Sequence, residues 1–116
     1  MPQRHRYNEK IELVKQGTGT EYIEGKAIEY GKLLMLESIS VEDETSALDH
    51  IRIGMMTPAY FLPWEEQKSP AAGELVFTQE EHSLRELQYF RCEVKGGLAG
   101  DKIKIYLNGY WQSWEG

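Results

Sequence analysis

The sequence predicts an all-β fold: a single β-sandwich, jelly-roll-like, with about eight strands. Short segments of alternating apolar and polar residues recur from Ile11 to Leu107. Glycine, proline, asparagine and aspartate separate these segments at intervals of roughly ten residues, a spacing typical of small sandwiches. With 116 residues, the chain is long enough for one domain that needs neither a disulfide nor a metal ion to fold.

The segments divide the chain into a short tail and one domain. Residues 1–8 are polar and predict an N-terminal arm, and the sandwich domain covers residues 9–116. Strands are expected over residues 10–14, 21–29, 33–41, 47–55, 60–62, 74–78, 89–94 and 102–108. A further strand or an exposed tail starts at Tyr110, and residues 79–87 fit either a helical turn or a polar edge strand.

The alternation of apolar and polar residues also predicts which side chains face the core and where the strands are irregular. Apolar side chains change face near Ser38, so a β-bulge there, or burial on both faces, is expected. Asn108-Gly109 matches the type I′ hairpin turn, which would end the preceding strand. The predicted core contains the inward residues of the clearest strands: Ala47, Ile51, Ile53, Met55, Phe90, Cys92, Val94, Ile103, Ile105 and Leu107.

Charge and hydropathy exclude several classes of partner. The net charge is −6, from 13 basic and 19 acidic residues, which argues against a broad nucleic-acid surface. No segment approaches the ~20 apolar residues of a membrane span, and the N-terminus lacks the apolar core of a signal peptide. We therefore expect no nucleic-acid partner, no membrane insertion and synthesis in the cytoplasm.

No motif supports catalysis or cofactor binding. Cys92 is the single cysteine and lies on the apolar side of its strand, as a buried thiol does. The three histidines are far apart in sequence and do not have the spacing of metal ligands. Acidic clusters such as Glu42-Asp43-Glu44 are typical of solvated loops, although a carboxylate pair could serve a glycosidase. The sequence thus predicts a protein that is not an enzyme and has no metal and no cofactor.

Charged and aromatic residues near the two ends suggest an interaction surface. Arg4-His5-Arg6 is the only dense basic group, and it is either a solvated end or an arm that binds an acidic partner. Trp64 and the C-terminal aromatic residues can anchor a protein interface, stack on sugar rings, or simply close the core. The predicted interface residues are Arg4, Arg6, Trp64, Tyr110 and Trp114.

From Gly31 onward, the sequence resembles small phage-encoded β-sandwich proteins of the virion, either head decoration or head–tail components. The resemblance covers about two thirds of the chain and consists of turns and strands, not site residues. It rests on Gly31-Lys32 before an apolar strand, residues 39–47, residues 51–54, residues 69–74, and Gly100-Asp101-Lys102 followed by residues 106–111.

The resemblance implies a non-enzymatic structural protein of a tailed-phage particle. Its expected partners are the major capsid protein or another virion protein and further copies of itself, with a trimer as a natural form of the homo-oligomer. It would be made in the host cytoplasm and reside in the virion. The alternative is a carbohydrate-binding module that uses exposed tryptophans, namely Trp64, Trp111 and Trp114. A catalytic carboxylate pair is a third, weaker alternative.

Overall fold

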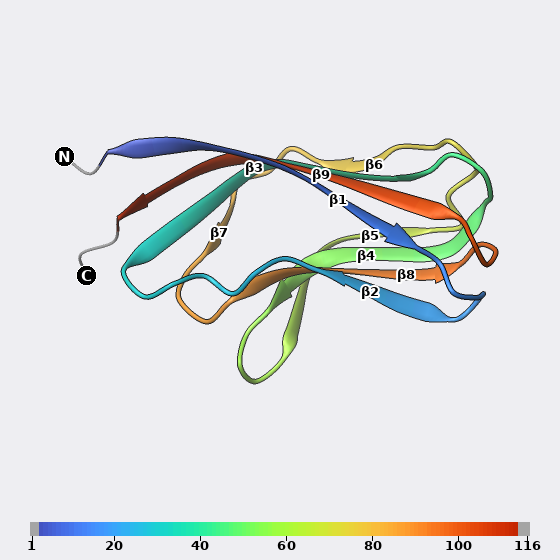
Figure 1. Ribbon diagram of the computed structural model, residues 1–116, viewed down its shortest axis with the longest axis horizontal. Helices are drawn as coiled ribbons and strands as arrows, with labels where there is room; N and C mark the ends of the chain where they lie inside the picture. Colours follow the sequence, from blue (N-terminus) through green and yellow to red (C-terminus); the bar gives the residue numbers. More distant parts are fainter. Residues whose placement is uncertain (1–2, 114–116) are drawn as a thin grey trace.

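The computed structural model describes residues 3–113, and within them it contains nine strands and no helix (Figure 1). The strands are β1 (Arg4–Val14), β2 (Thr20–Glu24), β3 (Lys32–Asp43), β4 (Leu48–Met56), β5 (Phe61–Lys68), β6 (Val76–Thr78), β7 (His82–Leu84), β8 (Tyr89–Gly96) and β9 (Lys102–Ser113). These residues include no helix that could span a membrane.

The strands form two antiparallel sheets that face each other. The five-stranded sheet has the order β1-β9-β3-β6, with β7 also paired to β3, and the four-stranded sheet has the order β2-β8-β4-β5. Neighbours in each sheet come from distant parts of the chain, because most connections cross from one sheet to the other (Figure 1). This strand order is that of a jelly roll, so the predicted fold class is confirmed.

The core lies between the sheets and is built as the alternation predicts. Phe90, Cys92, Val94, Ile103, Ile105 and Leu107 are each at most 2% exposed, as are Ile51 and Ile53. Ala47 is an exception: it precedes β4 and is exposed, while Leu48 occupies the inward position. Burial strongly raises the pKa of the Cys92 thiol, so this cysteine is a core side chain.

The two predicted irregularities had different outcomes. The β-bulge is confirmed, because the β3–β9 register shifts between Leu36 and Ser38. The turn at Asn108-Gly109 is wrong, since β9 runs straight through to Ser113. Gly109 has another role: a Cβ at this position would lie 1.8 Å from the Met35 carbonyl oxygen, so only glycine allows β9 to approach β3 beside the bulge.

The structure also corrects the start of the first predicted strand and the end of the strand predicted before Pro63. Residues 4–8, expected as an arm, belong to β1 and pair with β9 in continuous register from Arg4 opposite Gln112 to Val14 opposite Lys102. The strand expected to end at Pro63 continues to Lys68. Proline is tolerated there because β5 is an edge strand and the β4–β5 register shifts beside it, between Ile53 and Gly54.

Candidate binding surfaces

The structure brings together three of the five predicted interface residues. Arg4, Arg6 and Tyr110 all lie on the outer face of the β1–β9 pair, where Arg6 is directly opposite Tyr110. Trp64 lies elsewhere, on β5 of the other sheet. Trp114 is outside the described residues.

The shared surface is formed by alternate residues of two long strands. Even-numbered residues of β1 point outward because its odd-numbered residues pack toward the core. The guanidinium carbon of Arg4 lies 4.3 Å from the centre of the Tyr110 ring, and the Lys10 ammonium lies 5.9 Å from the centre of the Tyr106 ring. We call Arg4, Arg6, Lys10, Tyr106 and Tyr110 the cationic face.

The three cations of this face lack acidic partners within the described residues. Within residues 3–113, no carboxylate lies within 4.0 Å of Arg4, Arg6 or Lys10, the distance that defines an ion pair. At the other end of the same sheet, by contrast, Lys104 lies 3.3 Å from Glu44. The Glu44 carboxylate raises the pKa of Lys104. In a chain of net charge −6, the cationic face is therefore a local excess of positive charge.

The outer face of the four-stranded sheet carries a different charge arrangement. Arg52 lies 3.3 Å from Glu93 and 3.7 Å from Glu66, and Arg91 lies 2.8 Å from Glu24. The hydrogen bond from Arg91 to Glu24 raises the pKa of the guanidinium against the opposing effect of burial. Both arginines on this face are thus already matched within the chain.

Trp64 does not form an open platform. Its ring stacks on His82 with 4.1 Å between centroids and 5° between planes, and it packs against the core cluster. Burial lowers the pKa of His82, while Glu80 acts in the opposite direction. The pair closes the seam between β5 and β7.

Trp111 is also covered. The His5 ring stacks on it with 4.1 Å between ring centroids, and the Lys32 ammonium lies 4.8 Å from the centre of the Trp111 ring.

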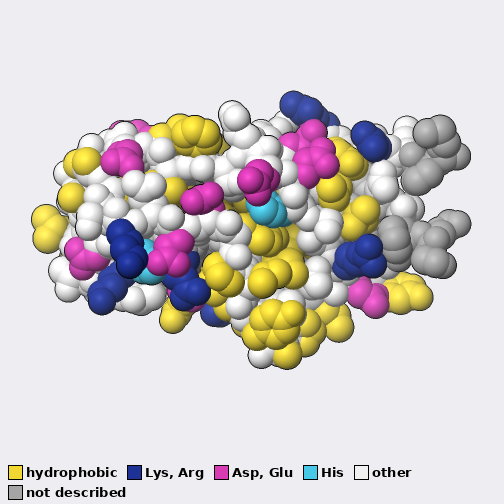
Figure 2. Space-filling view, turned by 180° about the vertical axis from the view of Figure 1, so that it is seen from behind, with side chains coloured by type: hydrophobic (Ala, Val, Ile, Leu, Met, Phe, Trp, Pro, Cys, Tyr) yellow, Lys and Arg dark blue, Asp and Glu magenta, His cyan; other side chains and the backbone are white. Residues whose placement is uncertain are grey.

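An apolar hairpin tip, which the sequence analysis did not single out, protrudes between β4 and β5 (Figure 1). Tyr60 and Leu62 are 58% and 40% exposed. The tip is closed by a hydrogen bond of 2.9 Å from the Thr57 amide to the Tyr60 carbonyl. Figure 2 shows hydrophobic side chains gathered on this protrusion. We call Pro58, Ala59, Tyr60, Leu62 and Pro63 the apolar hairpin; an apolar run between two prolines was the signal that could have revealed it.

Comparison with known proteins shows likeness of structure only. No protein-family model and no curated protein sequence matches the chain. The chain is similar to a subunit of Bacillus endospore appendages, described as disulfide-linked pili, with a TM-score of 0.58, 10% identity, and coverage of 99% of this chain and 92% of that one. It is also similar to a chain of the acid-stable capsid of the Helicobacter pylori bacteriophage KHP30, with a TM-score of 0.55, 14% identity, and coverage of 95% and 93%.

A weaker likeness is to the N-terminal cellulose-binding domain of a Cellulomonas fimi β-1,4-glucanase, with a TM-score of 0.40, 14% identity, and coverage of 92% of this chain and 78% of that one. A score this low carries no argument for this chain. The two stronger likenesses show the shared β-sandwich fold, one that occurs in a phage capsid and in bacterial pili.

Proposed function

We propose that this chain is a non-enzymatic structural protein of a tailed-phage particle, which binds the capsid or tail surface through its cationic face and associates with copies of itself. The observation that carries the proposal is the set of cations, Arg4, Arg6 and Lys10, that have no acidic partner within the described residues. The fold it shares with a phage capsid chain and a pilus subunit supports an assembly role.

The cationic face has the composition of a protein-binding surface. Arginine and tyrosine are enriched among the residues that dominate binding energy at interfaces. The Tyr110 ring already holds Arg4 in place, so less side-chain entropy is lost on binding. We expect the partner to be the major capsid protein or another virion protein that presents carboxylates to this face. The protein would be made in the host cytoplasm and reside in the virion.

The apolar hairpin supplies a surface for self-association. Contiguous exposed apolar groups on a soluble protein commonly mark contacts between proteins. The hairpin lies on the β4–β5 edge, away from the cationic face, so copies of the chain could associate while each still binds the particle. A trimer remains the natural form for a jelly-roll subunit on a capsid three-fold axis.

The described tryptophans give no specific support to the carbohydrate-binding alternative. Sugar stacking needs an open ring face, whereas Trp64 is stacked on His82 and Trp111 contacts both His5 and Lys32. Trp114, the third tryptophan of that hypothesis, is outside the described residues.

Particle binding tests the role of the cationic face. Arg4→Glu/Arg6→Glu should reduce co-sedimentation with particles that lack the protein by about a hundredfold, because two favourable charge contacts become repulsive. The matched control is Lys68→Glu/Lys95→Glu, which makes the same change in net charge on the opposite outer face. Equal binding by the two variants would refute the assignment of the surface.

Sedimentation velocity tests the apolar hairpin separately. Tyr60→Ser/Leu62→Ser should shift the assembly toward monomer by about tenfold or more in dissociation constant, since the exposed apolar area is removed. Leu98→Ser is the control, because Leu98 is 61% exposed but lies in the β8–β9 loop at a distance from the hairpin in sequence. An unchanged assembly in the hairpin variant would place self-association on another surface.

A further inference from the structure

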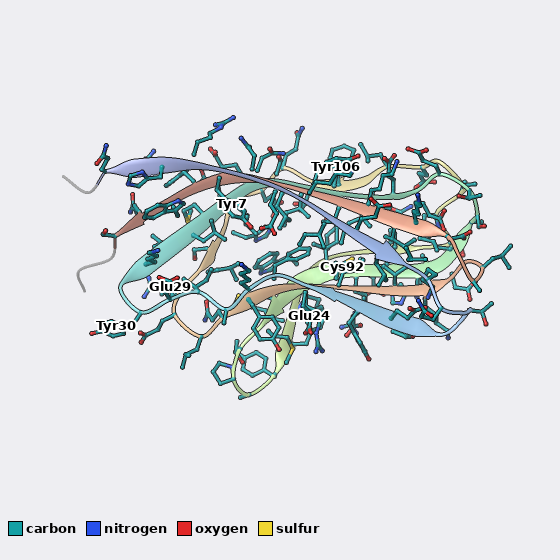
Figure 3. The ribbon with its side chains drawn as sticks, in the orientation of Figure 1. Tyr7, Glu24, Glu29, Tyr30, Cys92 and Tyr106 are labelled. Carbon is teal, nitrogen blue, oxygen red and sulfur yellow. The ribbon has the colours of Figure 1, made fainter. Side chains whose placement is uncertain are left out.

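A pocket of about 230 Å³ opens at the end of the sandwich where β1 begins and β9 ends. It lies between β1, β3 and β9 on one side and β8 with the β2–β3 loop on the other. Figure 3 shows Tyr7 on the upper sheet and Glu29 on the loop below it. Most of its lining is apolar: Ile28, Leu34, Leu84, Phe90, Leu107 and Trp111. We call this cavity the end pocket; it is distinct from the cationic face because its β1 residues point inward.

The polar wall of the end pocket contains one carboxylate without a cation. Tyr7 and Glu9 are half-buried, and the Tyr7 hydroxyl donates a hydrogen bond to Glu9. Burial, followed by the contact with Glu9, raises the pKa of Tyr7 well above its usual value, so the phenol remains a donor. Within the described part of the chain, no lysine, arginine or histidine lies within ion-pair distance of Glu9.

The cations at the mouth do not neutralise Glu9. Lys32 is committed elsewhere, because its ammonium lies 3.0 Å from Glu29 and 4.8 Å from the centre of the Trp111 ring. Lys26 lines the mouth from the β2–β3 loop, and its side chain is exposed. Most of the pocket lining is thus apolar, and its two carboxylates differ. Glu29, at the mouth, is paired with Lys32, whereas Glu9 has no cation within ion-pair distance among residues 3–113.

We propose that the end pocket binds a small organic ammonium compound: a single aromatic ring, or an apolar stem of similar size, that carries a primary ammonium group. The ring would lie among Phe90, Leu107 and Trp111, and the ammonium would donate to Glu9 and meet the lone pair of the Tyr7 hydroxyl. The size is suitable, since an apolar cavity of about 150 Å³ accepts benzene. The remaining volume accommodates a short arm. This inference is independent of the proposed particle role.

Three probes of nearly equal size separate the contributions of shape and charge. 2-Phenylethylamine carries the ammonium, 2-phenylethanol is neutral, and 3-phenylpropionate carries the opposite charge. By calorimetry, we expect the amine to bind with a dissociation constant of the order of 1 mM, typical of so small a ligand. The alcohol should bind about tenfold more weakly, and the carboxylate should show no measurable binding.

Variants test the assigned residues. Glu9→Gln should reduce amine affinity about tenfold, to that of the alcohol, while Glu12→Gln is the matched control on the outer face of the same strand. Ala27→Trp, at a pocket-lining position in the loop, should block both the amine and the alcohol. Lys26→Ala should strengthen amine binding severalfold by removing the competing cation. Amide NMR spectra establish that each variant is folded and show whether the Trp111 indole responds to the probe.

Two results would overturn the inference. If none of the probes binds the wild-type protein at concentrations of about 20 mM, the end pocket is not a ligand site. If the amine and the alcohol bind equally, or if Glu9→Gln retains the preference for the amine, Glu9 does not recognise a cation. Either result leaves the particle-binding test of the cationic face unaffected.

Discussion

On both outer faces of the sandwich, alternate strand residues point to solvent. The two faces differ in whether their arginines are paired with carboxylates of the same chain. On the four-stranded sheet, Arg52 and Arg91 each face a carboxylate within the chain. On the five-stranded sheet, Arg4 lies over a tyrosine ring, and Arg6 has no ion-pair partner among residues 3–113. Strand alternation alone would make these faces equivalent. The two faces therefore differ in charge matching within the chain, and this difference is the reason for proposing that the cationic face is the one that binds a partner.

The largest expected effect comes from blocking the close approach of β9, which carries Tyr106 and Tyr110 of the cationic face, to β3. Gly109→Ala should destabilise the protein by roughly 3 kcal/mol or more, because the new Cβ would lie 1.8 Å from the Met35 carbonyl oxygen and 3.0 Å from the Leu36 Cα. Gly19→Ala, with nothing within 4 Å of its Cβ, should change stability by no more than about 0.5 kcal/mol. Chemical denaturation compares them, and similar midpoints would show that β9 does not approach β3 as described.

A second pair of variants compares the two faces directly. Arg52→Ala should cost about 1–2 kcal/mol of folding stability, since it leaves Glu66 and Glu93 facing each other without the shared cation. Arg6→Ala should cost less than about 0.5 kcal/mol, because no partner within the described residues loses a charge contact. Urea denaturation at low and high salt measures both. Equal losses of folding stability would mean that the arginines of the two faces do not differ in their charge contacts.

The smallest effect concerns a charge pair that lies on neither face. Asp43 and Asp101 are both buried, and the pKa of Asp43 is raised, first by burial and also by the neighbouring Asp101. The pKa of Asp101 is lowered, chiefly by its hydrogen bonds with Ser46 and the Leu98 amide. A raised pKa in the folded state means that the stabilisation from protonated Asp43 is complete at low pH and is lost as the pH rises through that pKa.

Asp43→Asn should remove this loss of stability at high pH, because asparagine does not ionise. At pH 8 the variant should be more stable than the wild-type protein by roughly 0.5–1 kcal/mol, and the difference should shrink toward pH 4. The asparagine oxygen can still accept from the Thr45 and Ser46 amides, as Asp43 does. Thermal melts between pH 4 and pH 9 measure the effect, with Glu42→Gln as the control on the adjacent outward position. A constant difference across this range would contradict the raised pKa of Asp43.

The sequence predicted the parts of the fold that depend on long, regular alternation. It identified the sandwich, the bulge near Ser38 and the inward residues of β8 and β9. It did not identify residues 4–8 as strand, because their inward side chains are not aliphatic: His5 stacks on Trp111, and Tyr7 lines the end pocket. Gly109 was mistaken for a turn because the need for glycine arose from a neighbouring strand, which sequence spacing does not show.

Short edge strands contain too few alternating residues to predict which of their faces is buried. Leu75, just before β6, and Phe77, within it, are 47% and 55% exposed. The facing of β6 is set by its partner, because Val76 pairs with Val41 and Thr78 with Ile39, both inward residues of β3. The candidate surface was predicted in part, since the arginines and Tyr110 were named. Their convergence depended on the β1–β9 register, and the apolar hairpin was missed.

The continuous pairing of β1 with β9 has a consequence for anyone who wishes to attach something to this protein. Arg4 and Gln112 are direct partners, so the two strands leave the described structure about one strand spacing, ~5 Å, apart and at the same pole (Figure 1). A dye or tag attached at Arg4 or Gln112 would therefore sit beside the cationic face and the mouth of the end pocket. The β8–β9 loop, at the opposite pole, is the attachment point that leaves both surfaces uncovered.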